Sequence, residues 1–257
     1  MTTLPPLLLT SCVMVSAPST QIRDPNNRIA LTVRSIEKWL NISNNLKIVI
    51  CDGANYDFSS IIAKNFPSSD IECLHFNNDS ESVALYGKGY GEGEIIQYAL
   101  ENSVFLQKTE YFTKCTAKLW VDNFFDCLHF WNGTFLCDCD FSYGKNHKLI
   151  TFKSVDTSFY IVDKKYYIKN FLSAHLHVRE KQTYWLEHSF KDIVIANNLA
   201  KFMLPVAPIV CGVSGTSGSE NNYAFTDKVH NWTKRLLVKM DRSCTALIAD
   251  TPKSRRD

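Results

Sequence analysis

Alternating glycines near position 90 are the residues of this sequence whose types and spacing most directly indicate chemistry. The segment reads Gly87-Lys88-Gly89-Tyr90-Gly91-Glu92-Gly93 and leads into an apolar, helix-like pattern at 91–103. Glycines let several backbone N–H groups surround one anion, and the N-terminus of a following helix carries partial positive charge. We therefore expect a loop that binds a phosphate or diphosphate, with Lys88 adding charge. The spacing matches neither the dinucleotide-binding nor the P-loop fingerprint, so a flexible surface loop is the alternative interpretation.

The composition is that of an ordinary globular protein. The chain has 257 residues, 45% hydrophobic and 21% charged, enough for one large domain or two small ones. A formal charge of +2 is too small to indicate a nucleic-acid partner, and basic residues cluster only in the tail at 253–256. Nine cysteines without a C-x-x-C pair indicate neither a zinc site nor a disulfide framework, which predicts a cytoplasmic location.

No segment of the sequence has the character of a membrane span. No apolar run approaches the roughly 20 residues needed to cross a bilayer. The start of the chain is apolar, but it lacks the basic residues of a signal peptide and contains Pro5 and Pro6. We interpret 7–15 as a buried strand and leave open peripheral contact with the inner membrane.

Strand and helix patterns alternate through the first half of the chain. Strands are predicted at 7–15, 46–53 and 71–76, and helices at 25–41, 57–65 and 91–103. This order is typical of a mostly parallel sheet with helices on both faces, and such sheets bind ligands at the carboxyl ends of their strands. The sequence places Ser16-Ala17-Pro18, Asp52-Gly53 and the glycine segment at such ends.

The second half is richer in aromatic residues and follows a different order. Strands are predicted at 134–143, 149–153 and 157–163, helices at 184–198 and 226–240, and a Gly/Ser-rich loop at 214–219. No internal repeat or linker divides the chain. We therefore predict one mixed α/β domain over 1–257, in which about 1–125 binds a nucleotide and about 126–257 shapes the partner site.

In several of these segments the chain resembles GT-A type glycosyltransferases of bacterial cell-surface polysaccharide synthesis, such as lipopolysaccharide or capsule. The segments that carry the resemblance are Arg28, Thr32, Ser35 and Ile36 in the first helix, 48–53, 87–93, 111–119 and 185–188. The resemblance implies a Rossmann-like GT-A fold and transfer of a sugar from a nucleotide-sugar donor to a glycan or glycolipid acceptor.

The resemblance also assigns the nucleobase site to two strand ends. Ser16, Ala17 and Pro18 follow the first strand, and Asp52, followed by Gly53, would accept a hydrogen bond from a base N–H. A turn aspartate is the other interpretation of Asp52.

One departure from this family concerns its metal site. A typical member carries Asp-x-Asp on the strand after the helix predicted at 91–103, where it binds a divalent metal that neutralises the departing diphosphate. Here the corresponding segment runs from Lys114 to Lys118 without an acid. We favour these two lysines as fixed cations, so no cofactor is expected. A Mn²⁺ or Mg²⁺ site at Asp138 and Asp140 is the alternative, although a strand also places alternate residues on one solvated face.

Direct displacement of the nucleotide further needs a base for the acceptor hydroxyl. The resemblance assigns this role to Glu187, beside His188, with Asp156 in reserve. An acid that favours the helix dipole is the competing interpretation of Glu187. Two other functions stay open: a non-catalytic nucleotide-sugar or carbohydrate binding protein, which the missing Asp-x-Asp favours, and a nucleotidyltransferase, which would normally require metal-binding carboxylates.

Overall fold

The computed structural model describes residues 4–143, 150–199, 201–215, 218–221 and 225–240. The basic tail at 253–256 and positions 216–217 of the Gly/Ser-rich loop lie outside the described residues.

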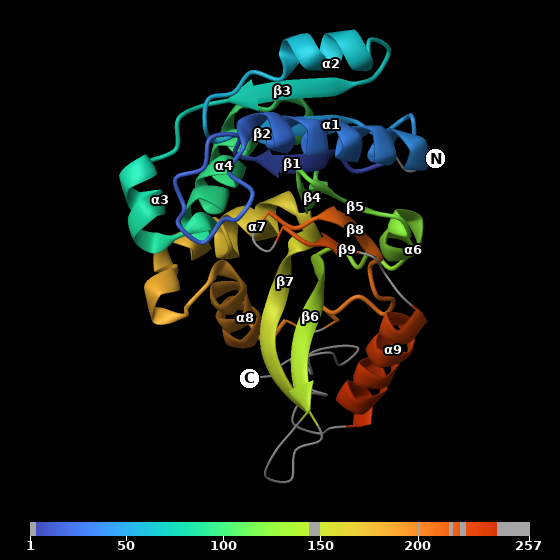
Figure 1. The fold of residues 1–257 in the computed structure, drawn as a ribbon. Coiled ribbons are helices and arrows are strands. Elements are labelled where there is room, and N and C mark those ends of the chain that lie inside the picture. The colour runs from blue at the N-terminus through green and yellow to red at the C-terminus, as the bar shows by residue number, and fades with distance from the viewer. Residues whose placement is uncertain (1–3, 144–149, 200, 216–217, 222–224, 241–257) are drawn as a thin grey trace.

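A six-stranded sheet with the order β3-β2-β1-β4-β7-β6 forms the centre of the molecule (Figure 1). Its strands are β1 (Leu7–Ser11), β2 (Ile48–Asp52), β3 (Ile71–His75), β4 (Tyr111–Thr116), β6 (Phe135–Tyr143) and β7 (Ile150–Asp163). The strands β3, β2, β1 and β4 run parallel, whereas β7 is antiparallel to β4 and β6 is antiparallel to β7. A smaller antiparallel sheet contains β5 (Leu119–Val121), β8 (Val210–Val213) and β9 (Glu220–Asn221).

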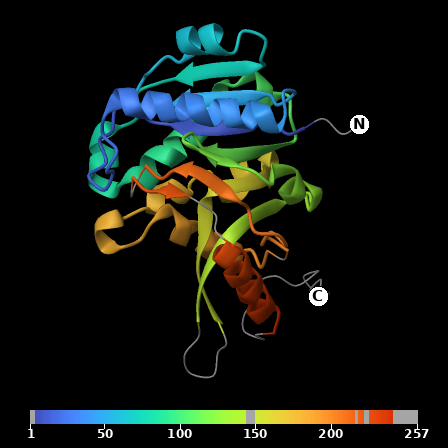
Figure 2. The ribbon, with the colours of Figure 1, turned by 45° about the vertical axis from the view of Figure 1, so that its right-hand side comes forward.

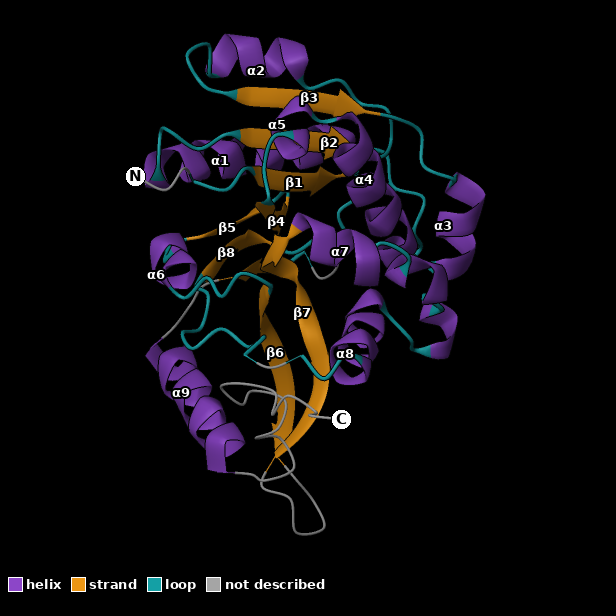
Figure 3. Cartoon of the chain, turned by 180° about the vertical axis from the view of Figure 1, so that it is seen from behind, coloured by secondary structure: helices purple, strands orange, loops and turns teal. Residues whose placement is uncertain are grey.

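Helices cover both faces of the central sheet, which confirms the predicted fold class of a mixed α/β protein with a mostly parallel sheet (Figures 1 and 3). The helices are α1 (Pro25–Ile42), α2 (Ser59–Asn65), α3 (Ser80–Tyr86), α4 (Lys88–Asn102), α5 (Val104–Gln107), α6 (Phe124–His129), α7 (Lys164–Asn170), α8 (Leu186–Ala196) and α9 (Phe225–Met240), with the short 3₁₀ turns η1 (Ala174–His177) and η2 (Glu180–Gln182).

The apolar run of β1 is continuous because the strand is buried on both faces. Leu7 and Leu9 belong to the core cluster that contains Trp39 of α1. Leu8 points the other way and belongs to the cluster that contains Ile96 of α4. Helix α1 begins at Pro25, whose fixed backbone angle suits a first helical position. The helix packs on one face of the central sheet and runs along its strands (Figure 2).

The glycine segment is not the loop that its composition predicted, because α4 already begins at Lys88. Its glycines are buried at close helix contacts. A Cβ atom added at Gly93 would lie 2.2 Å from Cβ of His175, and one added at Gly91 would lie 2.7 Å from Nδ2 of Asn78. Glycine serves here for close approach between elements rather than for loop flexibility.

The strands β6 and β7 extend beyond the rest of the sheet as a long hairpin, with α8 on one side and α9 on the other (Figures 1 and 3). One strand, β7, replaces the two that the sequence predicted at 149–153 and 157–163. Helix α9 exposes four large apolar side chains at helical spacing, Val229, Trp232, Leu236 and Met240. Within the described part of the chain, no helix is long and apolar enough to cross a membrane.

Candidate active site

A cavity of about 210 Å³ opens at the carboxyl ends of β1 and β4. The loop after β1, α4, β7, the first turn of α8 and the loop after β8 complete its wall. Open α/β sheets bind their ligands at this edge. Eight of the residues that the sequence singled out line the cavity together: Ser16, Ala17, Lys88, Gly89, Gly91, Lys118, Asp156 and Glu187.

Two buried cations lie in the wall of this cavity. Lys118 occupies the turn between β4 and β5 and is 5% exposed, and Arg28 on α1 is 6% exposed. A Cβ atom added at Gly215, in the loop after β8, would lie 3.3 Å from Nζ of Lys118 and 3.6 Å from Nη1 of Arg28. The two charged ends therefore flank the same point of the wall.

The guanidinium of Arg28 is held in place by backbone carbonyls. Its Nε donates to the carbonyl of Cys12 at 2.6 Å, and its Nη1 donates to the carbonyl of Ile22 at 2.9 Å. These contacts fix the position of the cation without neutralising it. Burial lowers the pKa of Arg28 as well as that of Lys118, which falls to about 7 because the neighbouring Arg28 also disfavours a second charge.

Lys114, the other lysine predicted to replace a metal, has a different role. It is fully buried, its Nζ forms an ion pair with Glu92, and it donates to the carbonyl of Thr157 at 2.6 Å. It does not line the cavity. Because its charge is neutralised inside the protein, Lys114 is not a cation for a ligand, and this corrects the sequence interpretation.

Asp52 is likewise engaged within the protein rather than aimed at a ligand. Its carboxylate is fully buried and accepts backbone N–H groups from Val13 at 2.9 Å, Ala54 at 2.8 Å and Tyr56 at 3.2 Å. It thus ties the loop after β1 to the loop after β2. Asp52 is therefore not placed to accept a hydrogen bond from a base N–H, as we expected. It is a turn aspartate, which was the alternative interpretation, and it shapes the edge of the cavity.

The N-terminus of α4, where we expected an anion, already holds a carboxylate of the protein. Oε1 of Glu180 accepts the N–H of Gly89 at 3.3 Å, and Oε2 accepts the hydroxyl of Ser19 at 3.0 Å. A Cβ atom at Gly87 would lie 2.0 Å from Cδ of Glu180, so this close approach requires glycine, which adopts a φ of +115° here. The residues of α4 that line the cavity are Lys88, Gly89, Gly91, Glu92 and Ile95.

Three further residues predicted to bind the donor lie beside the cavity rather than in it. Gly53 lines a second, neighbouring pocket, and Cys12 lines both this pocket and the cavity. The carbonyl of Pro18 accepts Nη2 of Arg23 at 3.2 Å. Tyr90 packs edge-on against His175, with ring centres 5.3 Å apart. Their placement supports the cavity wall without direct contact with its interior.

Glu187 reaches the cavity from the first turn of α8. Burial raises the pKa of its carboxyl, and the carboxylates of Glu92 and Asp156 raise it further, whereas Lys88 lowers it. A carboxylate with a raised pKa, placed where a hydroxyl group can approach, has the properties of a general base.

Of the two other residues predicted to take part in catalysis, Asp156 lines the cavity and His188 does not. His188 does not orient the Glu187 carboxylate, because its Nδ1 accepts the backbone N–H of Trp185 at 3.2 Å and caps α8. Its ring stacks between those of Tyr184 and Trp185. Asp156 on β7 does line the cavity, and one of its oxygens accepts the N–H of Ser158 at 2.8 Å.

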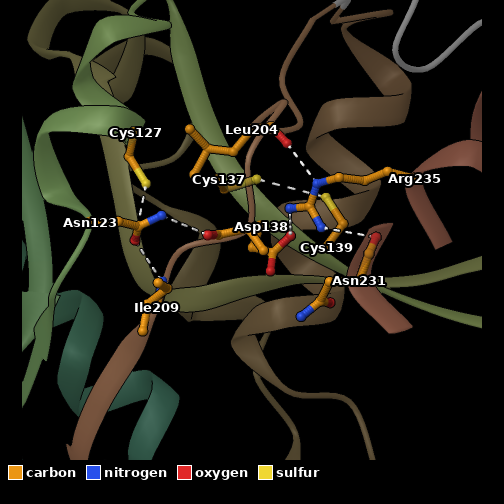
Figure 4. Close-up of polar contacts among 10 residues, drawn as sticks. Asn123, Cys127, Cys137, Asp138, Cys139, Leu204, Ile209, Asn231 and Arg235 are labelled. Atoms are coloured by element: carbon orange, nitrogen blue, oxygen red, sulfur yellow. Dashed lines mark hydrogen bonds and ion pairs between the residues drawn. The ribbon is translucent and has the colours of Figure 1, made fainter. Parts of the chain in front are cut away.

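The alternative metal site at Asp138 and Asp140 does not fit the structure. Asp138 accepts Nη2 of Arg235 at 2.7 Å (Figure 4), and Asp140 lies 3.8 Å from the ammonium of Lys153. Neither residue lines the cavity. Among the described residues, no group of three or more His, Cys, Asp or Glu side chains is arranged to hold a metal ion. Asp138 is therefore committed to Arg235, whereas Asp140 forms only an exposed ion pair with Lys153.

Arg28 is the residue that sequence reasoning left without a role. It belonged to a segment of the resemblance, but its spacing carries a further signal: it falls on the buried stripe of α1, whose members are Arg28, Thr32, Ser35, Ile36 and Trp39. A charged residue on the core-facing side of an amphipathic helix needs a reason to be there. The structure supplies this reason, because the loops after β1 and β8 bring Cys12 and Gly215 next to the Arg28 guanidinium in the cavity wall.

No protein-family model matches the chain, and no curated protein is similar to it in sequence. Solved structures resemble it in fold. The inositol-1-phosphate CTP transferase of T. maritima is 11% identical with a TM-score of 0.45, over 76% of this chain and 82% of that one. The glycosyltransferase GlyE of Streptococcus pneumoniae is 10% identical with a TM-score of 0.43, over 74% of this chain and 43% of that one.

A glycosyltransferase involved in glycosylation of the major capsid of PBCV-1 is 12% identical with a TM-score of 0.41, over 75% of this chain and 78% of that one. These structures of similar fold include two glycosyltransferases and one CTP transferase. Similarities this remote do not identify a reaction, so the assignment of function depends on the cavity itself.

Proposed function

We propose that the protein is a glycosyltransferase that moves a sugar from a nucleotide-sugar donor to a glycan or glycolipid acceptor in surface polysaccharide synthesis. The observation that carries the proposal is that a half-buried carboxylate with a raised pKa, Glu187, lines the same cavity as the buried side chain of Lys118. A base and a cation on one cavity are what displacement of a diphosphate by a hydroxyl requires.

The proposed step is a direct displacement at the anomeric carbon. The acceptor hydroxyl oxygen forms the new bond to that carbon while Glu187 takes the hydroxyl proton. The bond between the anomeric carbon and the phosphate oxygen breaks, and its electron pair leaves with the nucleoside diphosphate. Asp156 lines the same cavity and is the alternative candidate for the general base.

The experiment is a panel of nucleotide sugars incubated with and without glycan acceptors, with release of the nucleotide as the readout. We expect transfer from at least one donor, and Glu187→Gln should lower turnover roughly 10²-fold or more while donor affinity is kept. Glu101→Gln, on the exposed side of α4, is the matched control and should keep full activity.

The pH profile gives an independent reading of Glu187. Below its pKa the carboxyl is protonated and cannot accept a proton, so turnover should rise with pH through a value above that of an ordinary glutamate. No transfer from any donor, together with pyrophosphate release from a nucleoside triphosphate and a sugar phosphate, would favour a nucleotidyltransferase instead. Donor binding without either reaction would favour a non-catalytic binding protein.

We further propose that the protein works in the cytoplasm against the inner membrane, where a glycolipid acceptor would lie. The support is α9, whose exposed stripe of Val229, Trp232, Leu236 and Met240 has no covering among the described residues. Besides Arg235, which is paired with Asp138, the helix sequence carries three basic residues, Lys228, Lys234 and Lys239, against the single acid Asp227. Apolar and basic residues on one helix favour an anionic lipid surface, whereas a second copy would bring like charges together.

A further inference from the structure

The two buried cations of the cavity have no carboxylate partner, although carboxylates lie near them. No described acid is within ion-pair distance of Arg28 or Lys118. A buried charge without a partner is costly to the fold, so a wall that holds one fixed cation, Arg28, beside a buried lysine that can gain a proton suits an anion from outside.

The acidic groups that lie near Lys118 on the surrounding elements are all committed to other partners or neutral. From β2, Asp52 is occupied by three backbone N–H groups, and from α4, Glu92 is paired with Lys114. From the loop after β1, the thiol of Cys12 has a pKa raised to about 11 by burial, so it is neutral near pH 7. From α1 comes Arg28, a second cation.

We propose that Arg28 and Lys118 together bind the diphosphate of a nucleoside diphosphate ligand without a metal ion, and that Lys118 takes up a proton as the ligand binds. This rests on the proposed function, in which that diphosphate leaves the sugar, and it names the groups that receive it. A guanidinium fixed by backbone carbonyls presents its remaining N–H groups to phosphate oxygens, and an ammonium adds a point charge beside them.

The structure also explains why binding should be coupled to a proton. Lys118 has a pKa of about 7 because it is buried and lies beside Arg28. A dianion between the two cations reverses that repulsion, so the protonated form becomes favoured. At pH 8 a group with a pKa of about 7 is only about one-tenth protonated, so binding should take up on the order of one proton per site.

The test uses inorganic pyrophosphate as the probe and titration calorimetry at pH 8 in two buffers of different ionisation enthalpy, both freed of divalent metal on a chelating resin. We expect binding with proton uptake. Lys118→Met should abolish the uptake and weaken binding at least about tenfold, the scale for loss of one charge-assisted hydrogen bond. Among the described residues, the Lys118 ammonium makes no hydrogen bond, and the one bond to this residue, from the N–H of Val213 to its backbone carbonyl, does not depend on the side chain. The Lys118→Met variant should therefore fold even if Arg28→Gln does not.

Two matched controls test the specificity of the effect. Arg34→Gln removes an exposed arginine of the same helix, and Lys153→Met removes an exposed lysine. Both should bind pyrophosphate as the wild type does. Binding that requires Mg²⁺ or Mn²⁺, or that is unchanged in Lys118→Met, would overturn the inference.

Different results would contradict the metal-free diphosphate site and the proposed glycosyl transfer. If pyrophosphate binds with proton uptake but no nucleotide sugar is used, the diphosphate site stands and the proposed glycosyl transfer falls. If sugar transfer proceeds with undiminished rate and donor affinity in Lys118→Met, the transfer stands and the metal-free diphosphate site falls.

Discussion

Asp52 is a single buried carboxylate that shapes the edge of the candidate site through contacts within the protein. It accepts three N–H groups from two loops at the carboxyl edge of the sheet. Buried N–H groups that lose their acceptor pay the cost of desolvation without compensation. The loop that carries Ser16 and Ala17 into the cavity therefore depends on this residue.

Asp52→Ala should destabilise the fold by about 2 kcal/mol or more, since each unpaired buried N–H costs about 1–3 kcal/mol. The measurement is urea unfolding followed by far-UV circular dichroism. Asp57→Ala is the control, because Asp57 makes a similar bond to the N–H of Ser59 at 2.8 Å but is exposed, and it should cost less than 1 kcal/mol, as surface changes usually do. Equal midpoints for the two variants would mean that Asp52 does not hold the loops.

At the scale of elements, α4 is the helix that the rest of the site is packed around. Its glycines lie against α3 on one side and against η1 and the start of α8 on the other. Gly89 approaches Leu186, the neighbour of Glu187, so closely that an added Cβ would lie 2.9 Å from Cβ of Leu186. Close packing at Gly89 thus brings the proposed base to the cavity.

Gly93→Ala distinguishes the packing role from loop flexibility by the sign of its effect. An exposed helical glycine gains about 1 kcal/mol on replacement by alanine. Here the new methyl would overlap His175, so we expect a loss of about 1–3 kcal/mol in the free energy of unfolding instead. Gln97→Ala, one turn further along α4, should change stability by less than about 0.5 kcal/mol. A Gly93→Ala variant more stable than the wild type would disprove the close contact.

At the scale of the whole molecule, the exposed stripe of α9 and the cavity belong to different regions. Helix α9 lies beside the β6–β7 hairpin (Figures 1 and 3). The cavity lies at the carboxyl edge of the parallel strands. Attachment through α9 would leave the cavity accessible to a donor from solution.

We expect the protein to cosediment with vesicles of anionic phospholipid and much less with vesicles of neutral phospholipid, because both apolar burial and basic charge contribute. A Trp232→Ser, Leu236→Ser double variant should lose most of this binding while keeping its fold by circular dichroism. Ile195→Ser, which removes an exposed apolar side chain from α8, is the control and should bind as the wild type does. Undiminished binding by the double variant would place the contact elsewhere.

Local sequence patterns were enough to predict most of the element order and the fold class. Continuous apolar runs at β1 and β2 could be recognised because a strand buried on both faces needs no polar alternation, and Pro25 marked the start of α1. These signals are local, since they depend on residues close together in the chain. For the same reason, the carboxyl ends of the strands correctly indicated where a cavity would form.

Which side chains face that cavity depends on contacts between segments that are far apart in the chain. Lys114 and Lys118 are equivalent in sequence, yet one is neutralised by Glu92 and the other is buried beside Arg28, because their partners come from α4 and α1. The alternating glycines likewise permit a loop or a tight helix contact, and the bulk of His175 selects the second. Burial and charge pairing arise between segments far apart in the chain, so no local pattern encodes them.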